Sequence, residues 1–270
     1  MRDKGVVYLI SGTKHAVVLV VSIASLRAFW DGPITVVGTD AAGRELADNL
    51  QGDSRLGVES VRMSHGARRK NSGYVNKTRL HQVVDYDKTV FLDADTLVMG
   101  EIDEVFPRND EMVLTTWGGW NTMGKIMSGR VAKWKNAEPE LTQRMLGIPW
   151  PAINTGVMGW SRETEMVRDW ESVTTKNVSF MCDELAAQIM YPDYPVRLLS
   201  DRWNCSPLYG LEKNIAEVWH FHGKKHLHPK SAGIWYPEYE RCVRANYAGI
   251  SSWTPAGDKR LREWEAREVE

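Results

Sequence analysis

Apolar segments in the first 110 residues alternate between a pattern typical of buried strands and one typical of helices. Short runs of Val, Ile and Leu predict strands, and longer stretches with helical spacing of apolar residues predict helices. The expected strands are residues 6–10, 34–37, 58–63 and 90–92, and the expected helices are residues 41–50 and 74–84. Strands that alternate with helices predict a mostly parallel central sheet flanked by helices on both faces.

One segment fits either type of element. Residues 16–23 are rich in Val, which favours a strand. The apolar run continues without a break to residue 29, however, as in a helix that is buried on all sides. Because two parallel strands need a crossover connection between them, we expect a helix here.

The second half of the chain is less regular. We expect strands at residues 112–116 and 218–222, and helices at residues 163–173 and 183–190. Residues 255–270 alternate in charge at helical spacing, which is typical of a solvated terminal helix. Because no clean linker interrupts the rest, we expect one α/β domain over residues 1–254 and a charged C-terminal helix over residues 255–270.

Composition and charge narrow the class of protein. The 270 residues carry 34 basic and 35 acidic side chains, so the sequence gives no indication of a nucleic-acid partner. The best apolar run, residues 16–21, is far shorter than the roughly 20 residues of a membrane helix, so no integral membrane segment is expected. The cysteines, Cys182, Cys205 and Cys242, are too scattered for a disulfide framework, which indicates a reducing, cytoplasmic location.

A pair of carboxylates follows the fourth expected strand directly. Asp93 and Asp95 come after an apolar run, and the carboxyl ends of parallel strands form the edge at which open α/β sheets bind ligands. Two acids this close repel each other unless one is protonated or a cation lies between them. Mg²⁺ or Mn²⁺ prefers such oxygen ligands and keeps open positions for substrate phosphates.

An isolated Asp-x-Asp is also common as a polar turn, and three classes of enzyme use it after a strand. A phosphatase of the haloacid-dehalogenase type would use Asp93 as its nucleophile. That motif normally has Thr two residues after the second Asp and lies near the N-terminus, whereas here Thr96 follows Asp95 immediately. A nucleotidyltransferase and a sugar-nucleotide transferase are the other two.

Further residues favour the last class. Residues 91–98 with 102–106 resemble the metal-binding segment of the family-8 glycosyltransferases, which include glycogenin and bacterial lipopolysaccharide galactosyltransferases. Other matching blocks follow in the family's order over about residues 6 to 230, at 77–80, 86–88, 153–158, 183–184, 203–206 and 218–223. The resemblance implies a single-domain GT-A type nucleotide-diphospho-sugar transferase fold.

The resemblance also implies a metal site. In this family two aspartates and a later histidine hold Mn²⁺ (or Mg²⁺), which bridges the diphosphate of the donor, and the matching positions are Asp93, Asp95 and His220. His222 is an alternative ligand, but His220 takes the family's place three residues before Gly223.

The same resemblance implies the residues around the donor. Lys77 matches a basic residue that contacts the donor, and Lys224 or Lys225 replaces a later lysine where this chain has His226. Asn154, Thr155 and Gly156 match a loop that receives the sugar hydroxyls. Asp183 and Glu184 match an Asp-Gln pair beside the anomeric carbon and are the expected catalytic residues. The expected donor-binding set is Ser11, Thr13, Lys77, Asp93, Ala94, Asp95, Asn154, Thr155, Gly156, Gly223, Lys224 and Lys225, and Asn204 completes it.

The segment that follows the first expected strand departs most from the family's sequence pattern. Where the family has acidic or Asn residues and a Tyr that meet the nucleotide, this chain has the residues 11–15, Ser-Gly-Thr-Lys-His.

Taken as a whole, the resemblance implies a metal-dependent retaining transfer of a hexose to a carbohydrate or other hydroxyl acceptor. UDP-glucose or UDP-galactose is the expected donor. A non-catalytic sugar-nucleotide-binding protein is a further alternative, and the sequence fixes neither the acceptor nor the oligomeric state.

Overall fold

The computed structural model describes residues 2–63, 72–117, 139–147, 151–176, 178, 181–207, 216–222, 226 and 228–253. The expected helix over residues 255–270 and three expected donor-binding residues, Gly223, Lys224 and Lys225, lie outside these ranges.

Within the described residues the main sheet has seven strands in the order β3-β2-β1-β4-β7-β6-β8. Their bounds are β1 Arg2–Ile10, β2 Ile34–Gly38, β3 Val58–Arg62, β4 Tyr86–Leu92, β6 Met112–Thr116, β7 Ile153–Ser161 and β8 Val196–Leu199. Of these strands β7 alone is antiparallel to its neighbours β4 and β6, and the other pairs are parallel. The predicted mostly parallel sheet is confirmed.

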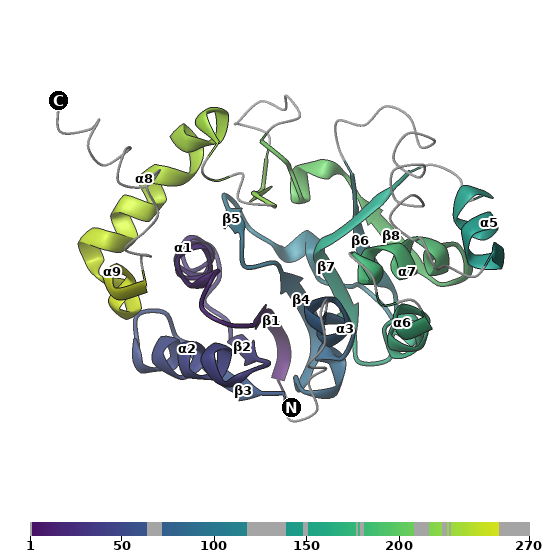
Figure 1. Ribbon diagram of the computed structural model, residues 1–270, viewed down its shortest axis with the longest axis horizontal. Helices are drawn as coiled ribbons and strands as arrows, with labels where there is room; N and C mark the ends of the chain where they lie inside the picture. The colour runs from purple at the N-terminus through teal and green to yellow at the C-terminus, as the bar shows by residue number, and fades with distance from the viewer. Residues whose placement is uncertain are drawn as a thin grey trace.

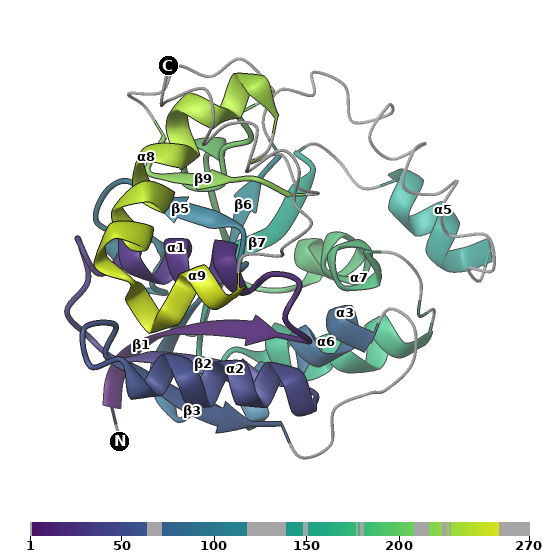
Figure 2. The ribbon, with the colours of Figure 1, turned by 60° about the vertical axis from the view of Figure 1, so that its left-hand side comes forward.

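Helices cover both faces of this sheet, as predicted (Figure 1 and Figure 2). One hydrophobic core joins the sheet to α1, α2, α8 and α9, and a second joins the opposite face to α6 and α7, beside which α3 lies. The bounds are α1 Ala16–Leu26, α2 Ala41–Gly52, α3 Ser72–Thr78, α5 Pro139–Gly147, α6 Glu165–Lys176, α7 Cys182–Met190, α8 Pro229–Ala245 and α9 Ile250–Trp253.

The Val-rich segment after β1 is a helix, as expected. Every residue of α1 is buried, because the helix lies between the sheet on one side and α8 and α9 on the other. Burial on all sides outweighs the weak strand preference of Val. Two serines anchor it by polar contacts: the Ser22 hydroxyl contacts Tyr8 at 3.1 Å and Thr96 at 2.8 Å, and the Ser25 hydroxyl accepts from the Val98 amide at 3.0 Å.

Two expectations about local structure are wrong. Residues 154–156, expected to be a loop, belong to β7, which is buried along its whole length between β4 and β6. The helix expected over residues 74–84 ends at Thr78 and is followed by a 3₁₀ helix, Leu80–Gln82. The Thr78 hydroxyl donates to the Val75 carbonyl at 2.8 Å, a local hydrogen bond that competes with continued helix.

A second, two-stranded sheet was also not predicted as such. In it β5 (Thr96–Val98) pairs antiparallel with β9 (Val218–His220), with Thr96 opposite His220. Residues far apart in the sequence are thereby held side by side next to the carboxyl end of β4 (Figure 2). Among the described helices, none combines the length and apolar character required to cross a bilayer.

The buried position of α1 predicts a large effect of truncating its side chains. Leu19 is fully buried, so Leu19→Ala should lower the free energy of unfolding by about 2–5 kcal/mol, measured by urea denaturation. As a control, Met99→Ala removes a side chain that is 46% exposed and should cost about 1 kcal/mol or less. Equal losses in the two variants would contradict this account of the core.

Candidate active site

The two aspartates after β4 lie in a turn that is held from two sides. The Asp93 amide donates to the Gly156 carbonyl of β7 at 2.8 Å, and the Asp95 carbonyl accepts from the Phe221 amide at 2.8 Å. The Thr96 hydroxyl also donates to the Asp93 carbonyl at 2.9 Å. The backbone of this turn is therefore fixed by strands that come much later in the sequence.

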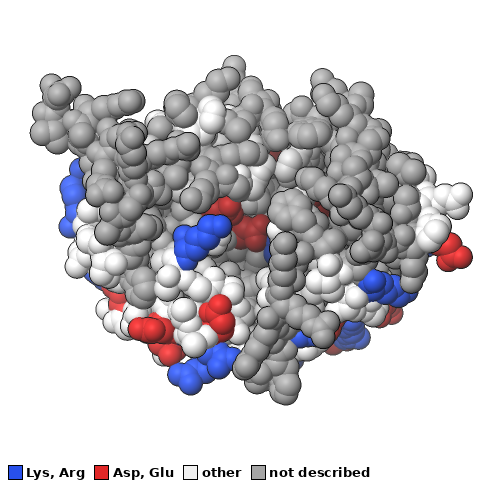
Figure 3. Space-filling model, viewed as in Figure 1, with Lys and Arg blue, Asp and Glu red and all other residues white. Residues whose placement is uncertain are grey.

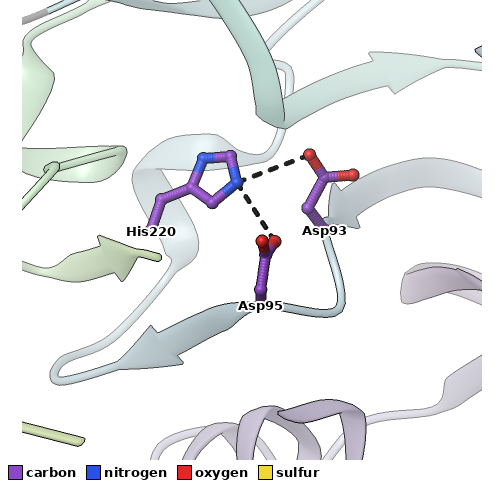
Figure 4. Close-up of side chains that lie close together, drawn as sticks. All are labelled: Asp93, Asp95 and His220. Atoms are coloured by element: carbon purple, nitrogen blue, oxygen red, sulfur yellow. Dashed lines mark ion pairs between the residues drawn. The ribbon is translucent and has the colours of Figure 1, made fainter. Parts of the chain in front are cut away.

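His220 joins the two aspartates (Figure 4). Its Nε2 atom lies 3.2 Å from Asp95 Oδ1 and 3.6 Å from Asp93 Oδ2. One ligand atom from each of the three residues lies within 4.8 Å of the others, so the structure brings together the predicted metal ligands. The ring of His222, the alternative ligand, packs instead against two other rings. Its centre lies 4.9 Å from the centre of the His220 ring and 5.0 Å from the centre of the Trp117 ring.

Lys77, in the last turn of α3, lies between two acids. Its Nζ atom is 3.1 Å from Asp93 Oδ1 and 3.2 Å from Asp183 Oδ2, and it donates to the Thr155 carbonyl at 3.4 Å. The side chain is 9% exposed, and its ammonium group lies 4.7 Å from the centre of the Phe91 ring. A buried ammonium group with three acceptors is held in place, so Lys77 orients both carboxylates.

Burial and neighbouring charges shift the pKa values of Asp93, Asp95 and His220 in different directions. Burial raises the pKa of Asp93 despite the attraction of Lys77 and His220. Burial would also raise the pKa of Asp95, but the charge and hydrogen bond of His220 hold it below its ordinary range. For His220 burial alone would lower the pKa, and the two aspartates outweigh it and raise it. The two aspartates therefore favour positive charge at the position of the imidazole.

The expected catalytic pair lies in the first turn of α7 and is buried, with Asp183 at 2% exposure and Glu184 at 3%. The Thr155 hydroxyl donates to Asp183 Oδ2 at 3.1 Å, and Asn154 Nδ2 donates to Glu184 Oε2 at 2.7 Å. Both β7 residues therefore orient the acids of α7. Their predicted contact with sugar hydroxyls stays a prediction.

The absence of a side chain at Gly156 makes room for His220. The predicted contact of Gly156 with the donor sugar stays a prediction. In the structure a Cβ atom at this position would lie 2.2 Å from Cε1 of His220, far inside van der Waals contact. The missing side chain makes room for the imidazole ring, so a glycine is required here by the histidine itself.

The loop after β1 holds the remaining expected residues. Ser11 and Thr13 are exposed there, and the Ser11 hydroxyl donates to Asp40 Oδ2 at 2.8 Å. Asp40 follows β2 and also accepts from the Gly12 amide at 2.9 Å, so it fixes the shape of this loop. Sequence reasoning missed Asp40, although an acid just after a strand and before a helix is a recognisable signal. Ala94 is partly buried and packs against the core.

The metal-ligating atoms available at this site fit a divalent cation. Two carboxylate oxygens and one imidazole nitrogen suit Mn²⁺, and the oxygens also suit Mg²⁺. Lys77 pairs with both Asp93 and Asp183, so at this point one ammonium group faces two carboxylates. Figure 3 shows acidic atoms in a recess near the middle of the viewed face, next to basic ones.

Comparison with known proteins gives structural relatives only. No protein-family model matches the chain, and no curated protein matches it in sequence. Among solved structures, the galactosyltransferase LgtC in complex with donor and acceptor sugar analogues matches with a TM-score of 0.56 and 15% identity, over 97% of this chain and 99% of LgtC. The chain has the GT-A fold of a glycosyltransferase.

Two longer glycosyltransferases share this fold. The bifunctional glycosyltransferase WbbM matches with a TM-score of 0.63 and 14% identity over 93% of this chain, and GlyE of Streptococcus pneumoniae with 0.59 and 13% over the whole chain. This chain spans about half of WbbM, at 52%, and 65% of GlyE. At such identities the likeness establishes the fold, as predicted.

The contact between Gly156 and His220 predicts the effect of a single methyl group. Gly156→Ala should displace the imidazole and weaken Mn²⁺ binding by about 10- to 100-fold, measured by isothermal titration calorimetry. The matched control is Gly52→Ala at the exposed end of α2, where a Cβ atom meets nothing within 4 Å, and it should leave the affinity unchanged. Wild-type affinity in Gly156→Ala would show that the ring position does not matter for binding.

Proposed function

We propose that this chain is a metal-dependent retaining glycosyltransferase that moves a hexose from a nucleotide diphosphate sugar to an acceptor hydroxyl. The observation that carries the proposal is the convergence of Asp93, Asp95 and His220 at the carboxyl end of β4. Metal-binding side chains at this edge of a sheet are placed where α/β proteins bind their ligands.

The shared fold supports this class of reaction over the phosphatase, nucleotidyltransferase and binding-protein alternatives. LgtC has nearly the same length as this chain, and its structure was obtained with donor and acceptor sugar analogues. We propose that this chain also binds a donor and an acceptor. UDP-glucose or UDP-galactose is the donor we propose, although residues 11–15 depart from the family's nucleotide-binding pattern.

The pairing of two carboxylates with one ammonium group supports a metal requirement. A donor diphosphate is itself an anion, and the carboxylates of Asp93 and Asp183, which share one ammonium group, would repel it. When bound to Asp93, Asp95 and His220, Mn²⁺ or Mg²⁺ supplies a Lewis acid for the leaving diphosphate. We further propose that Lys224 or Lys225 contacts the same diphosphate, while Lys77 keeps Asp93 and Asp183 in place.

Asp183 and Glu184 are the proposed catalytic residues. Both carboxylates are buried and oriented by β7, and a fixed carboxylate beside the anomeric carbon stabilises positive charge in the transition state. The solved structures include an active-site mutant of LgtC in which a glutamine is replaced by glutamate, with a TM-score of 0.58 and 15% identity. We propose that Glu184 occupies the corresponding place, so that this chain carries a glutamate there naturally.

We also propose a location from the cysteines. All three are buried and none forms a disulfide bond, which fits the reducing cytoplasm that we propose. The acceptor that we propose is a carbohydrate or another hydroxyl compound.

A panel of nucleotide sugars tests the function directly. With Mn²⁺ present, at least one donor should raise the melting temperature and should transfer its sugar, with retained anomeric configuration in the product by NMR. Asp95→Asn should weaken metal-dependent donor binding by about 100-fold or more, because a direct ligand is lost. Asp85→Asn is the matched control, since Asp85 precedes β4 at the opposite end of the strand and its side chain is 76% exposed.

The outcomes separate the alternatives. Release of inorganic phosphate from a phosphoester, with phosphate trapped on Asp93, would identify a phosphatase. Release of pyrophosphate would identify a nucleotidyltransferase. Donor binding without turnover under any condition would identify a binding protein, and the absence of any metal-dependent donor effect would overturn the transferase proposal.

The role of Glu184 gives a separate kinetic prediction. Glu184→Leu removes the carboxylate and should lower kcat by about 100-fold while the KM for the donor stays roughly constant, since the charge acts mainly in the transition state. Steady-state kinetics with the donor identified by the panel measure both parameters. A raised KM with unchanged kcat would show that Glu184 only binds the ground state.

A further inference from the structure

We propose that Asn204 is a positioning residue that fixes the His220 imidazole in the form that binds a metal ion, and this inference rests on the proposed metal-dependent function. Asn204 follows the 3₁₀ helix Asp201–Trp203 and is 7% exposed. It forms a continuous series of hydrogen bonds with four other buried residues, which are Thr115, Asn154, Glu184 and His220.

The direction of this series is set by a backbone amide. The Gly156 amide donates to Asn154 Oδ1 at 2.9 Å. Because a backbone N–H can only donate, the atom of Asn154 that faces it is the carbonyl oxygen. The other end of the same side chain, its NH₂ group, therefore faces Glu184 Oε2 at 2.7 Å, an acceptor.

The orientation of Asn204 follows from that of Asn154. Asn154 Oδ1 lies 2.7 Å from Asn204 Nδ2, which must be a donor because an oxygen there would face another oxygen. The same NH₂ group donates to Thr115 Oγ1 at 2.7 Å, so both of its hydrogens are used. Asn204 Oδ1 is then the atom that faces His220 Nδ1, at 2.7 Å.

The orientation of Asn204 determines which nitrogen of the His220 ring carries the hydrogen. An amide oxygen only accepts, so His220 Nδ1 carries the hydrogen in this contact. In the neutral ring the lone pair then belongs to Nε2, the atom that lies beside Asp93 and Asp95. A histidine that binds a metal through one nitrogen and donates from the other to a fixed acceptor is a common arrangement in proteins.

The backbone keeps Asn204 at this distance from His220. The Cys205 amide donates to the Val218 carbonyl at 2.9 Å, and the His220 amide donates to the Cys205 carbonyl at 2.9 Å. Cys205, the residue after Asn204, is thus hydrogen-bonded to β9 through both its amide and its carbonyl group. Gly156 lies against Cε1 and Nδ1 of the same ring, where a Cβ atom would be 2.2 and 2.5 Å away, so the imidazole has little room to move toward β7.

A double-mutant cycle tests whether Asn204 acts through His220. In the full-length protein, Mn²⁺ binding is measured by electron paramagnetic resonance for wild type, Asn204→Leu, His220→Ala and the double variant. Asn204→Leu should weaken binding by about 10- to 100-fold. In the His220→Ala background the same substitution should have no further effect, because the group on which it acts is gone.

Two further variants complete the test. Asn204→Ala repeats the cycle in case the leucine does not fit, and melting curves without metal identify any variant that fails to fold. Asn49→Leu, on the exposed face of α2, is the matched control and should bind Mn²⁺ as wild type does.

Additive losses in the cycle, or unchanged affinity in the Asn204 variants, would overturn the positioning role and leave the proposed function intact. If wild type itself binds no divalent cation, the metal-dependent function fails, and the role of Asn204 fails with it.

Discussion

The ion pairs of Lys77 with Asp93 and Asp183 are the contacts on which the rest of the site depends. Two acids from different elements, one after β4 and one at the start of α7, are kept at the same buried ammonium group. Removing a partner from such a group leaves an uncompensated buried charge, which is strongly destabilising. The lysine therefore joins the two halves of the site, the metal-binding acids and the proposed catalytic acids, by one side chain.

The antiparallel strand β7 makes this arrangement possible. It lies between β4 and β6, and its residues Asn154, Thr155 and Gly156 each contact a different part of the site. Asn154 orients Glu184, Thr155 orients Asp183, and Gly156 admits the His220 ring. Strand residues hold such contacts more accurately than loop residues, and the register between β6 and β7 shifts at this point of β7.

The likeness to LgtC, WbbM and GlyE at 13–15% identity is expected if a fold is kept by its core and a site by a few contacts. Many sequences can fill a core of the right volume and pattern. The acids, the lysine and the histidine are less replaceable, because each one compensates the charge of another. By contrast, residues 11–15 in the loop after β1 depart from the pattern of the family that the sequence resembles.

The sequence by itself determined the alternation of strands and helices, the buried helix α1, and the acids at the end of β4, because these depend on local periodicity and on residues adjacent in the chain. The tertiary structure alone decided that residues 154–156 belong to a strand, that β5 pairs with β9, and that Gly156 serves His220. It also gave Asn204 and Asp40 hydrogen-bond partners that the sequence does not indicate. Such contacts join residues that are far apart in the chain, and the burial that favours them exists only once the sheet has assembled.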